Sequence, residues 1–179
     1  MKLLRAVLFG TFSILLLGSI LSLVLPSHGH CEVVFLIREP PALVLHQTMT
    51  PKLVAQWNPF SRSSQDVPFR FGGPASGPRA FYTWSDPLGS RGTFQVTGVY
   101  PNREVNFSIR IRNREESGSF ELRPAAGGQQ TLVKWIIDYQ AGILPWDRFY
   151  ALAFGTIMGP AMNSGAAALK KQCGDSGPD

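Results

Sequence analysis

Cysteine, net charge and recognisable catalytic motifs are all scarce in this chain of 179 residues. Cys31 and Cys173 are too few for a disulfide framework, and no CxxC pair or cysteine–histidine cluster suggests a zinc site. No Ser, His or Asp stands in a nucleophile motif such as GxSxG. The glycine-rich segment 72–78 lacks the spacing of a phosphate-binding loop. We therefore predict no metal, no cofactor and no catalytic residue.

Positive charge is also too low to indicate nucleic-acid binding. The formal charge is +5, but Lys2 and Arg5 precede an apolar run, which leaves only about +3 for the rest of the chain. Aromatic and β-branched residues occur through most of the sequence, so we do not expect disorder. The length fits one domain with a short extension.

One long apolar run is present near the N-terminus. Ala6–Leu25 contains 20 residues without a charge, and a helix of that length spans about 30 Å, the thickness of a bilayer's hydrocarbon core. A cleaved signal peptide is the alternative, but the run is long for one and no clean small-x-small site follows. Lys2 and Arg5 predict a cytoplasmic N-terminus. We thus expect a single-pass membrane protein with its domain on the extracytoplasmic side.

After this run, apolar residues alternate with polar ones, as in half-buried strands. Val33, Phe35 and Ile37 share one face of a first strand. Two short helical pieces, 42–49 and 50–56, follow Pro40–Pro41. Six more strands are then expected around Phe69–Phe71, Ala80–Trp84, Thr93–Thr97, Val105–Arg112, Phe120–Leu122 and Thr131–Gln140.

The C-terminal segment has helical spacing and would cover the apolar face of this sheet. Its predicted stripe consists of Trp146, Phe149, Tyr150, Ala153, Phe154 and Ile157 and continues with Met162, Gly165, Ala166 and Leu169. Gly159–Pro160 is expected to break or kink the helix. The sequence therefore predicts an α+β fold in which a curved antiparallel sheet wraps around one long helix, plus an N-terminal transmembrane helix.

A family resemblance rests on several short segments in this order. They are Ile37–Pro41 with Val44, Trp57–Pro59, Gly73–Gly77 leading into Tyr82 and Trp84, Gly89–Gly92, Val133–Trp135, and Gly165 with Ala168–Lys170. The chain resembles the SRPBCC superfamily of START-like helix-grip proteins, its polyketide cyclase/dehydrase-type group, and especially small membrane-anchored members. Gly159–Pro160 and Gln129–Gln130 depart from that pattern. The resemblance implies a helix-grip fold with a cavity for hydrophobic molecules, but it does not imply one activity.

The resemblance also sets the expected organisation of the chain. Residues 1–30 form the membrane anchor and linker, residues 31–173 form the SRPBCC/START-like domain, and residues 174–179 form a flexible tail. In such a fold Cys31 and Cys173 lie at distant ends, so a native disulfide is disfavoured.

Candidate ligand-binding residues are those expected to point into the cavity: Tyr82, Trp84, Phe94, Phe107, Trp135, Tyr139, Phe154 and Met162. Simple core packing is the favoured explanation of these positions, although packing and ligand lining are not exclusive in this fold. The hydroxyls of Tyr82 and Tyr139 need partners if buried and could orient a ligand. By contrast, the carboxylates Glu104, Glu115, Glu116, Glu121 and Asp138 are expected on outward faces or in turns, where no acid–base chemistry is favoured.

The leading hypothesis is a membrane-tethered protein that binds a lipid-like or other hydrophobic small molecule in a helix-grip cavity. A packed interaction module for an envelope protein is the alternative, so a protein partner stays possible. A cyclase-type enzyme comes last, because no acid–base pair is evident. Whether the chain is an enzyme is thus left open, with the sequence favouring a binder.

Overall fold

The computed structural model describes residues 2–62, 69–85, 91–111 and 114–174. Its elements follow the predicted order of a strand, short helices, six strands and a long helix, and three short helices form where two were expected. They are α1 (Lys2–Ser22), β1 (His28–Ile37), α2 (Pro41–Met49), α3 (Pro51–Trp57), α4 (Pro59–Arg62), β2 (Arg70–Gly72), β3 (Phe81–Ser85), β4 (Arg91–Tyr100), β5 (Glu104–Ile111), β6 (Arg114–Ala125), β7 (Gln130–Gln140) and α5 (Pro145–Gln172).

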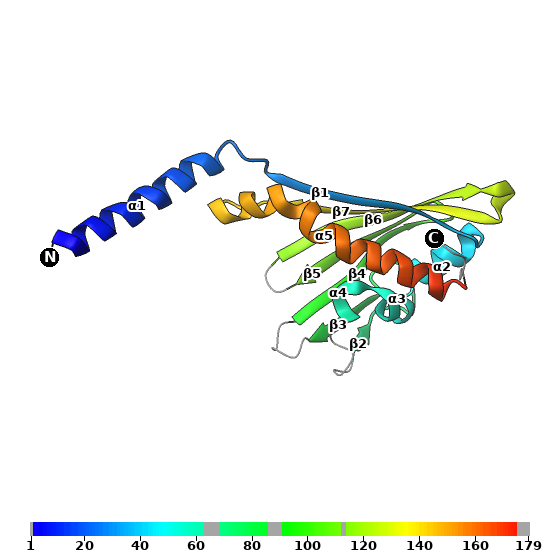
Figure 1. The fold of residues 1–179 in the computed structure, drawn as a ribbon. Coiled ribbons are helices and arrows are strands. Elements are labelled where there is room, and N and C mark those ends of the chain that lie inside the picture. Colours follow the sequence, from blue (N-terminus) through cyan, green and yellow to red (C-terminus); the bar gives the residue numbers. More distant parts are fainter. Residues whose placement is uncertain (1, 63–68, 86–90, 112–113, 175–179) are drawn as a thin grey trace.

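The strands form one antiparallel sheet in the order β1-β7-β6-β5-β4-β3-β2. Each strand from β3 to β7 pairs with the strand that precedes it in the sequence. The first strand, β1, instead pairs with the last strand, β7, and forms one edge of the sheet. Figure 1 shows the sheet curving over α5, with α3 and α4 beside the middle of that helix. The predicted α+β architecture is confirmed.

Proline opens each of the helices in the domain. Pro41, Pro51, Pro59 and Pro145 are the first residues of α2, α3, α4 and α5. A helix leaves the N–H groups of its first turn without intrahelical partners, so proline loses nothing there and its fixed φ suits the helix. Thr50 precedes α3, and its side chain makes no capping hydrogen bond.

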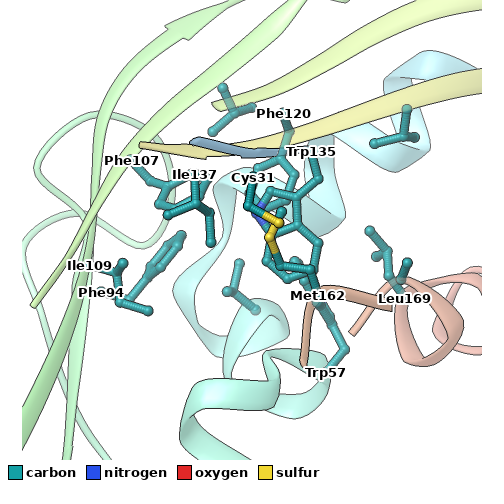
Figure 2. Close-up of a cluster of buried hydrophobic side chains, with 14 of the residues drawn as sticks. Cys31, Trp57, Phe94, Phe107, Ile109, Phe120, Trp135, Ile137, Met162 and Leu169 are labelled. Carbon is teal, nitrogen blue, oxygen red and sulfur yellow. The ribbon is translucent and has the colours of Figure 1, made fainter. Parts of the chain in front are cut away.

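A core of apolar side chains lies between the sheet and the helices. Ile137, Trp57 and Leu169 come from β7, α3 and α5, and each is almost completely buried. Figure 2 shows how such side chains from all three elements converge. Each large apolar side chain buried in this way stabilises the fold by roughly 1.5–3 kcal/mol. Both cysteines are buried, and no disulfide joins them.

The apolar N-terminal run forms the helix α1, which is shorter than the predicted span. α1 ends at Ser22, three residues before Leu25, so the uncharged part of the helix from Ala6 onward is only about 26 Å long. A hydrocarbon core is about 30 Å thick. Among the helices of the described ranges, none is both long enough and apolar enough to cross a membrane. Figure 1 shows α1 projecting away from the domain.

Three local predictions need correction. His28 and His30, expected in a flexible linker, belong to β1 because they pair with Gln140 and Asp138 of β7. Pro160 does not break α5, which continues through it to Gln172. The predicted apolar stripe of α5 is also divided, because Phe154 is buried whereas Trp146 and other members are exposed.

Candidate site beside Glu116

Five aromatic side chains form a continuous row across the inner face of the sheet. They come from consecutive strands β3 to β7, and neighbouring ring centroids lie 4.8–5.6 Å apart. The members of this aromatic row are Tyr82, Phe94, Phe107, Phe120 and Trp135. Trp57 from α3 packs edge-on against Phe120 and Trp135, 5.6 Å from each. Four of the predicted ligand-binding residues therefore pack against one another in this part of the core.

The hydroxyl of Tyr82 is held by the short helices. It accepts a hydrogen bond of 2.8 Å from Nδ2 of Asn58 and makes another of 3.1 Å with Oγ of Ser61. All three side chains are buried. Burial raises the pKa of Tyr82 despite these two hydrogen bonds, so the hydroxyl keeps its proton at neutral pH. These hydrogen bonds connect α4 and the residue before it to β3. The hydroxyl of Tyr82 therefore already has hydrogen-bond partners within the protein.

The other predicted ligand-binding residues are buried as well. Trp84 packs against Tyr82, with ring centroids 5.3 Å apart, and it lines a pocket of about 300 Å³ with Arg70 and Arg91. Met162 is completely buried under the sheet. Tyr139 of β7 stacks on Phe154 of α5, with centroids 5.7 Å apart. This second aromatic group lies toward the beginning of α5 and includes a residue absent from the predicted site, Tyr150.

Glu116 is the buried acid of this region. It pairs with Ile109 in the register of β5 and β6, and residues directly opposite in an antiparallel pair point to the same face. Ile109 points into the core, and the Glu116 residue is likewise only 4% exposed. The prediction that Glu116 faces outward or lies in a turn is wrong. The structure places this carboxyl group on the inner face of the sheet.

Tyr150 of α5 contacts Glu116, and Arg114 of β6 contacts Tyr150. The hydroxyl of Tyr150 donates a hydrogen bond of 3.4 Å to Oε1 of Glu116. The guanidinium carbon of Arg114 lies 4.1 Å from the centre of the Tyr150 ring, a distance at which a cation is attracted to the ring. We call Glu116, Tyr150 and Arg114 the Glu116 cluster. It joins the beginning of β6 to the first turns of α5.

Burial dominates the electrostatics of the Glu116 cluster. It raises the pKa of Glu116 from its ordinary value of 4.5 to about 7, against the opposing effects of the Tyr150 hydrogen bond and the Arg114 charge. Burial and the nearby Glu116 carboxylate together raise the pKa of Tyr150 to about 12. Glu116 therefore exchanges its proton near neutral pH, while Tyr150 stays protonated and remains a donor.

One oxygen of Glu116 is left over. Within the described part of the chain, its Oε2 is buried and has no hydrogen-bond partner. A buried polar atom without a partner costs about 1–3 kcal/mol, and more when the group is charged. Such an atom can accept a hydrogen bond from a ligand when the carboxyl is ionised, or donate one when it is protonated.

Sequence reasoning missed Glu116 although a signal was present. Phe120 and Leu122 mark the strand in the sequence, and counting back in steps of two reaches Gly118 and then Glu116. The sequence predicts a strand only around Phe120–Leu122, whereas β6 begins at Arg114 and so includes Glu116. Two further titratable side chains lie elsewhere: His46 is exposed, and Arg148 donates a hydrogen bond of 3.1 Å to the backbone oxygen of Leu25.

Comparison with known proteins identifies the fold only. No protein-family model matches the chain, and no curated protein sequence matches it. Solved structures do match. A protein from Rhodobacter sphaeroides is 19% identical, with a TM-score of 0.57 over 83% of this chain and 94% of that one. Protein Ms6760 from Mycobacterium smegmatis is 15% identical, with a TM-score of 0.53 over 82% of this chain and 88% of that one.

A third match is DynU16, a protein of the dynemicin biosynthetic locus. It is 14% identical, with a TM-score of 0.55, and the alignment covers 83% of this chain but 48% of DynU16. At such low identities the likeness concerns the fold alone, a curved antiparallel sheet packed on a long C-terminal helix.

Proposed function

We propose that the protein binds a hydrophobic small molecule, lipid-like in character, between the sheet and α5, and that the Glu116 cluster holds the molecule's single polar group. The observation that carries this proposal is the unpaired, buried Oε2 of Glu116. In an interior lined by aromatic rings, an apolar ligand with one hydrogen-bonding group would supply the missing partner. Binding sites of this kind combine an apolar lining with a few placed polar groups.

Tyr139 and Phe154 complete the proposed site. Both are buried, and both contact Tyr150 through their rings. They would provide the apolar wall beside the polar group of the ligand. Tyr82, Trp84, Phe94, Phe107, Trp135 and Met162 are retained as residues lining the same interior.

A membrane tether is the second part of the proposal. Apolar side chains of α1 are exposed on the helix surface, among them Phe9, Ile14 and Leu17. Immersion of this helix in lipid would bury them and keep the domain near a source of apolar ligands. A cytoplasmic N-terminus with the domain on the other side of the membrane stays a prediction, and protease protection of reconstituted vesicles would test it.

Native mass spectrometry of the full chain in lipid nanodiscs tests the ligand proposal. We expect the wild type to carry a bound small molecule, Glu116→Gln to lose at least tenfold in occupancy, and the control Glu115→Gln to behave as wild type. Glu115 is the matched control because it is adjacent and exposed, and pairs with Arg110 on the surface. Tenfold corresponds to about 1.4 kcal/mol, the scale of one hydrogen bond to a charged group.

Two outcomes separate the parts of this proposal. Equal occupancy in all three proteins would keep apolar ligand binding and remove the role of Glu116. The ligand-binding proposal would be wrong if all three proteins were empty and if dodecanol, dodecylamine and methyl laurate left the melting temperature unchanged. The close packing of the aromatic row would then favour the interaction module.

A cyclase-type enzyme is a second candidate, and the Glu116 cluster is the observation that favours it. A carboxyl group whose pKa is about 7 can give or take a proton at neutral pH, which suits general acid–base catalysis. Tyr150 would stabilise the ionised form. The two functions differ in one result: for an enzyme, Glu116→Gln abolishes turnover of the bound molecule while the variant still binds it.

A further inference from the structure

The first half of α5 has an unusual outer face. Its inner face carries buried Ala151, Phe154 and Met158, but the opposite face exposes Trp146 and Leu152, each 59% accessible, together with Phe149 and Ile157. No charged residue occurs in α5 between Arg148 and Lys170. A helix on the surface of a soluble domain normally turns charged side chains outward. The composition of α5 therefore fits an apolar environment on both faces.

This outer face is continuous with α1. The guanidinium group of Arg148 donates a hydrogen bond of 3.1 Å to the backbone oxygen of Leu25, just after α1. Figure 1 shows the end of α1 beside the beginning of α5. The exposed apolar side chains of the two helices consequently meet at one end of the domain.

The distribution of exposed apolar side chains on α1 indicates that lipid, and not a partner protein, covers this surface. Exposed apolar residues of α1 occur at consecutive positions, and hence on every side of the helix: Val7, Leu8, Phe9, Phe12, Ile14, Leu15, Leu16, Leu17, Ile20 and Leu21. A partner protein covers one side of a helix, whereas lipid surrounds it. The exposed stripe of α5 adjoins this helix, so the same lipid can cover both.

Charge and aromatic character at the junction agree with a lipid surface. Trp146 is the exposed tryptophan of the domain, and tryptophan is enriched where membrane and water meet. Arg148 lies two residues later and would place its positive charge among lipid headgroups while its stem stays on apolar surface.

We propose that the outer face of α5 from Trp146 to Ile157 lies on the surface of a lipid bilayer in which α1 is immersed. This inference rests on the membrane tether proposed above. It adds a second contact with lipid, made by α5 in addition to α1. Tyr150 lies within the same stretch of helix, so the Glu116 cluster would be held close to the lipid surface. Apolar molecules could then pass from the bilayer into the interior without crossing water.

The positions of the tryptophans provide a specific test. Trp57, Trp84 and Trp135 are buried in the core, whereas Trp146 is exposed. The full chain is reconstituted into phosphatidylcholine–phosphatidylglycerol vesicles with or without brominated acyl chains, which quench tryptophans that touch lipid. We expect quenching in the wild type and its loss in Trp146→Phe.

A second pair of variants keeps Trp146 as the reporter. The double variant Phe149→Ser with Leu152→Ser should weaken the quenching of Trp146, because the helix face loses its apolar contacts. The matched control Val34→Ser removes an exposed apolar side chain from β1 and should leave the quenching unchanged. Circular dichroism of each variant shows whether the fold is kept.

Flotation of the vesicles distinguishes the possible failures. If the protein floats but brominated lipid quenches the wild type and Trp146→Phe equally, the α5 contact is wrong and the tether stands. If the protein does not float, both membrane proposals fail, while ligand binding is still judged by mass spectrometry. If Trp146 is not quenched and the protein forms dimers that the double variant dissociates, this face binds a second copy, which overturns the inference.

Discussion

The hydroxyl of Tyr150 on α5 lies 3.4 Å from Oε1 of Glu116 on β6. This contact joins the long helix to the inner face of the sheet through a titratable group. Other polar side chains of the buried interior, such as those of Asn58 and Ser61, have partners near Tyr82, whereas Oγ1 of Thr50 and Nε1 of Trp135 are buried without one. Of these unpartnered groups in the described interior, only the carboxyl of Glu116 can also take up or release a proton near neutral pH.

Glu116 should make the protein less stable as the pH rises. Its pKa is raised from 4.5 in the unfolded chain to about 7 in the fold, so the folded state binds the proton more tightly. The stabilisation is present below about pH 4.5 and is lost between pH 4.5 and 7, by about 3 kcal/mol in total. Urea denaturation at about pH 5 and pH 8, followed by tryptophan fluorescence, measures this loss.

The variant Glu116→Gln should flatten that dependence, because glutamine does not titrate. Glu115→Gln serves as the control and should keep the wild-type slope between the two pH values. An unchanged slope in Glu116→Gln would show that Glu116 ionises as readily in the fold as in the unfolded chain.

Two glycines should respond oppositely to replacement by alanine. A Cβ atom at Gly118 would clash with the Phe107 ring and lie 2.5 Å from the backbone oxygen of Ile136, whereas one at Gly155 would make an ordinary contact of 3.4 Å with the backbone oxygen of His30. Gly118→Ala should therefore destabilise the fold by about 1–3 kcal/mol. Gly155→Ala, inside α5, should stabilise it by about 0.5–1 kcal/mol. Thermal unfolding of the two variants would refute this contrast if they shifted equally.

Loss of the Asn58 side chain should cost more stability than loss of the Ser61 hydroxyl. Asn58 donates to Tyr82 and also accepts a hydrogen bond of 3.1 Å from the backbone N–H of Phe60. Ser61 also makes two hydrogen bonds, with Tyr82 and with the backbone oxygen of Asn58, but its hydroxyl is smaller than the buried amide, so its removal leaves a smaller cavity. We expect Asn58→Ala to lose about 2–3 kcal/mol and Ser61→Ala about 1 kcal/mol. Chemical denaturation of both variants provides the measurement, and Tyr82→Phe should reduce the difference between them.

His30 should titrate at a higher pH than an isolated histidine. A hydrogen bond of 2.7 Å with Asp138 raises its pKa most, and nearby Glu32 adds to the effect. The protonated form stabilises the fold below the unfolded pKa of 6.5, and this contribution is lost as the pH rises through the folded pKa. Because the pair is exposed, it is worth only a few tenths of a kcal/mol. NMR titration should show a lower His30 pKa in Asp138→Asn than in Glu104→Gln.

The fold could be predicted where the sequence repeats a simple pattern. Alternation from Val105 to Ile111 predicts both a strand and its inner face, and Val105, Phe107 and Ile109 on that face are buried. Periodicity could not reveal how α5 is rotated against the sheet. Trp146 and Phe154 are both compatible with one apolar stripe, and only packing shows that the first is exposed while the second is buried.

The candidate site was harder to predict than the fold. The eight residues proposed to face inward are all buried, because large aromatic side chains are the usual occupants of an inner sheet face. Glu116 lies outside the predicted strand Phe120–Leu122, so the sequence assigns it to an outward position or a turn. Its position follows from the register of β6 with β5, which depends on pairing between strands and not on the local sequence.

The pairing of β1 with β7 has a consequence for synthesis on the ribosome. β1 is the first strand to leave the exit tunnel, but its ladder partner β7 and the helix α5 that packs on it are the last elements to follow. His30 must find Asp138 across 108 residues. Translation proceeds at about 5–20 residues per second, so the backbone groups of β1 stay unpaired for several seconds or longer. A growing chain should therefore need protection from aggregation until its C-terminal helix emerges.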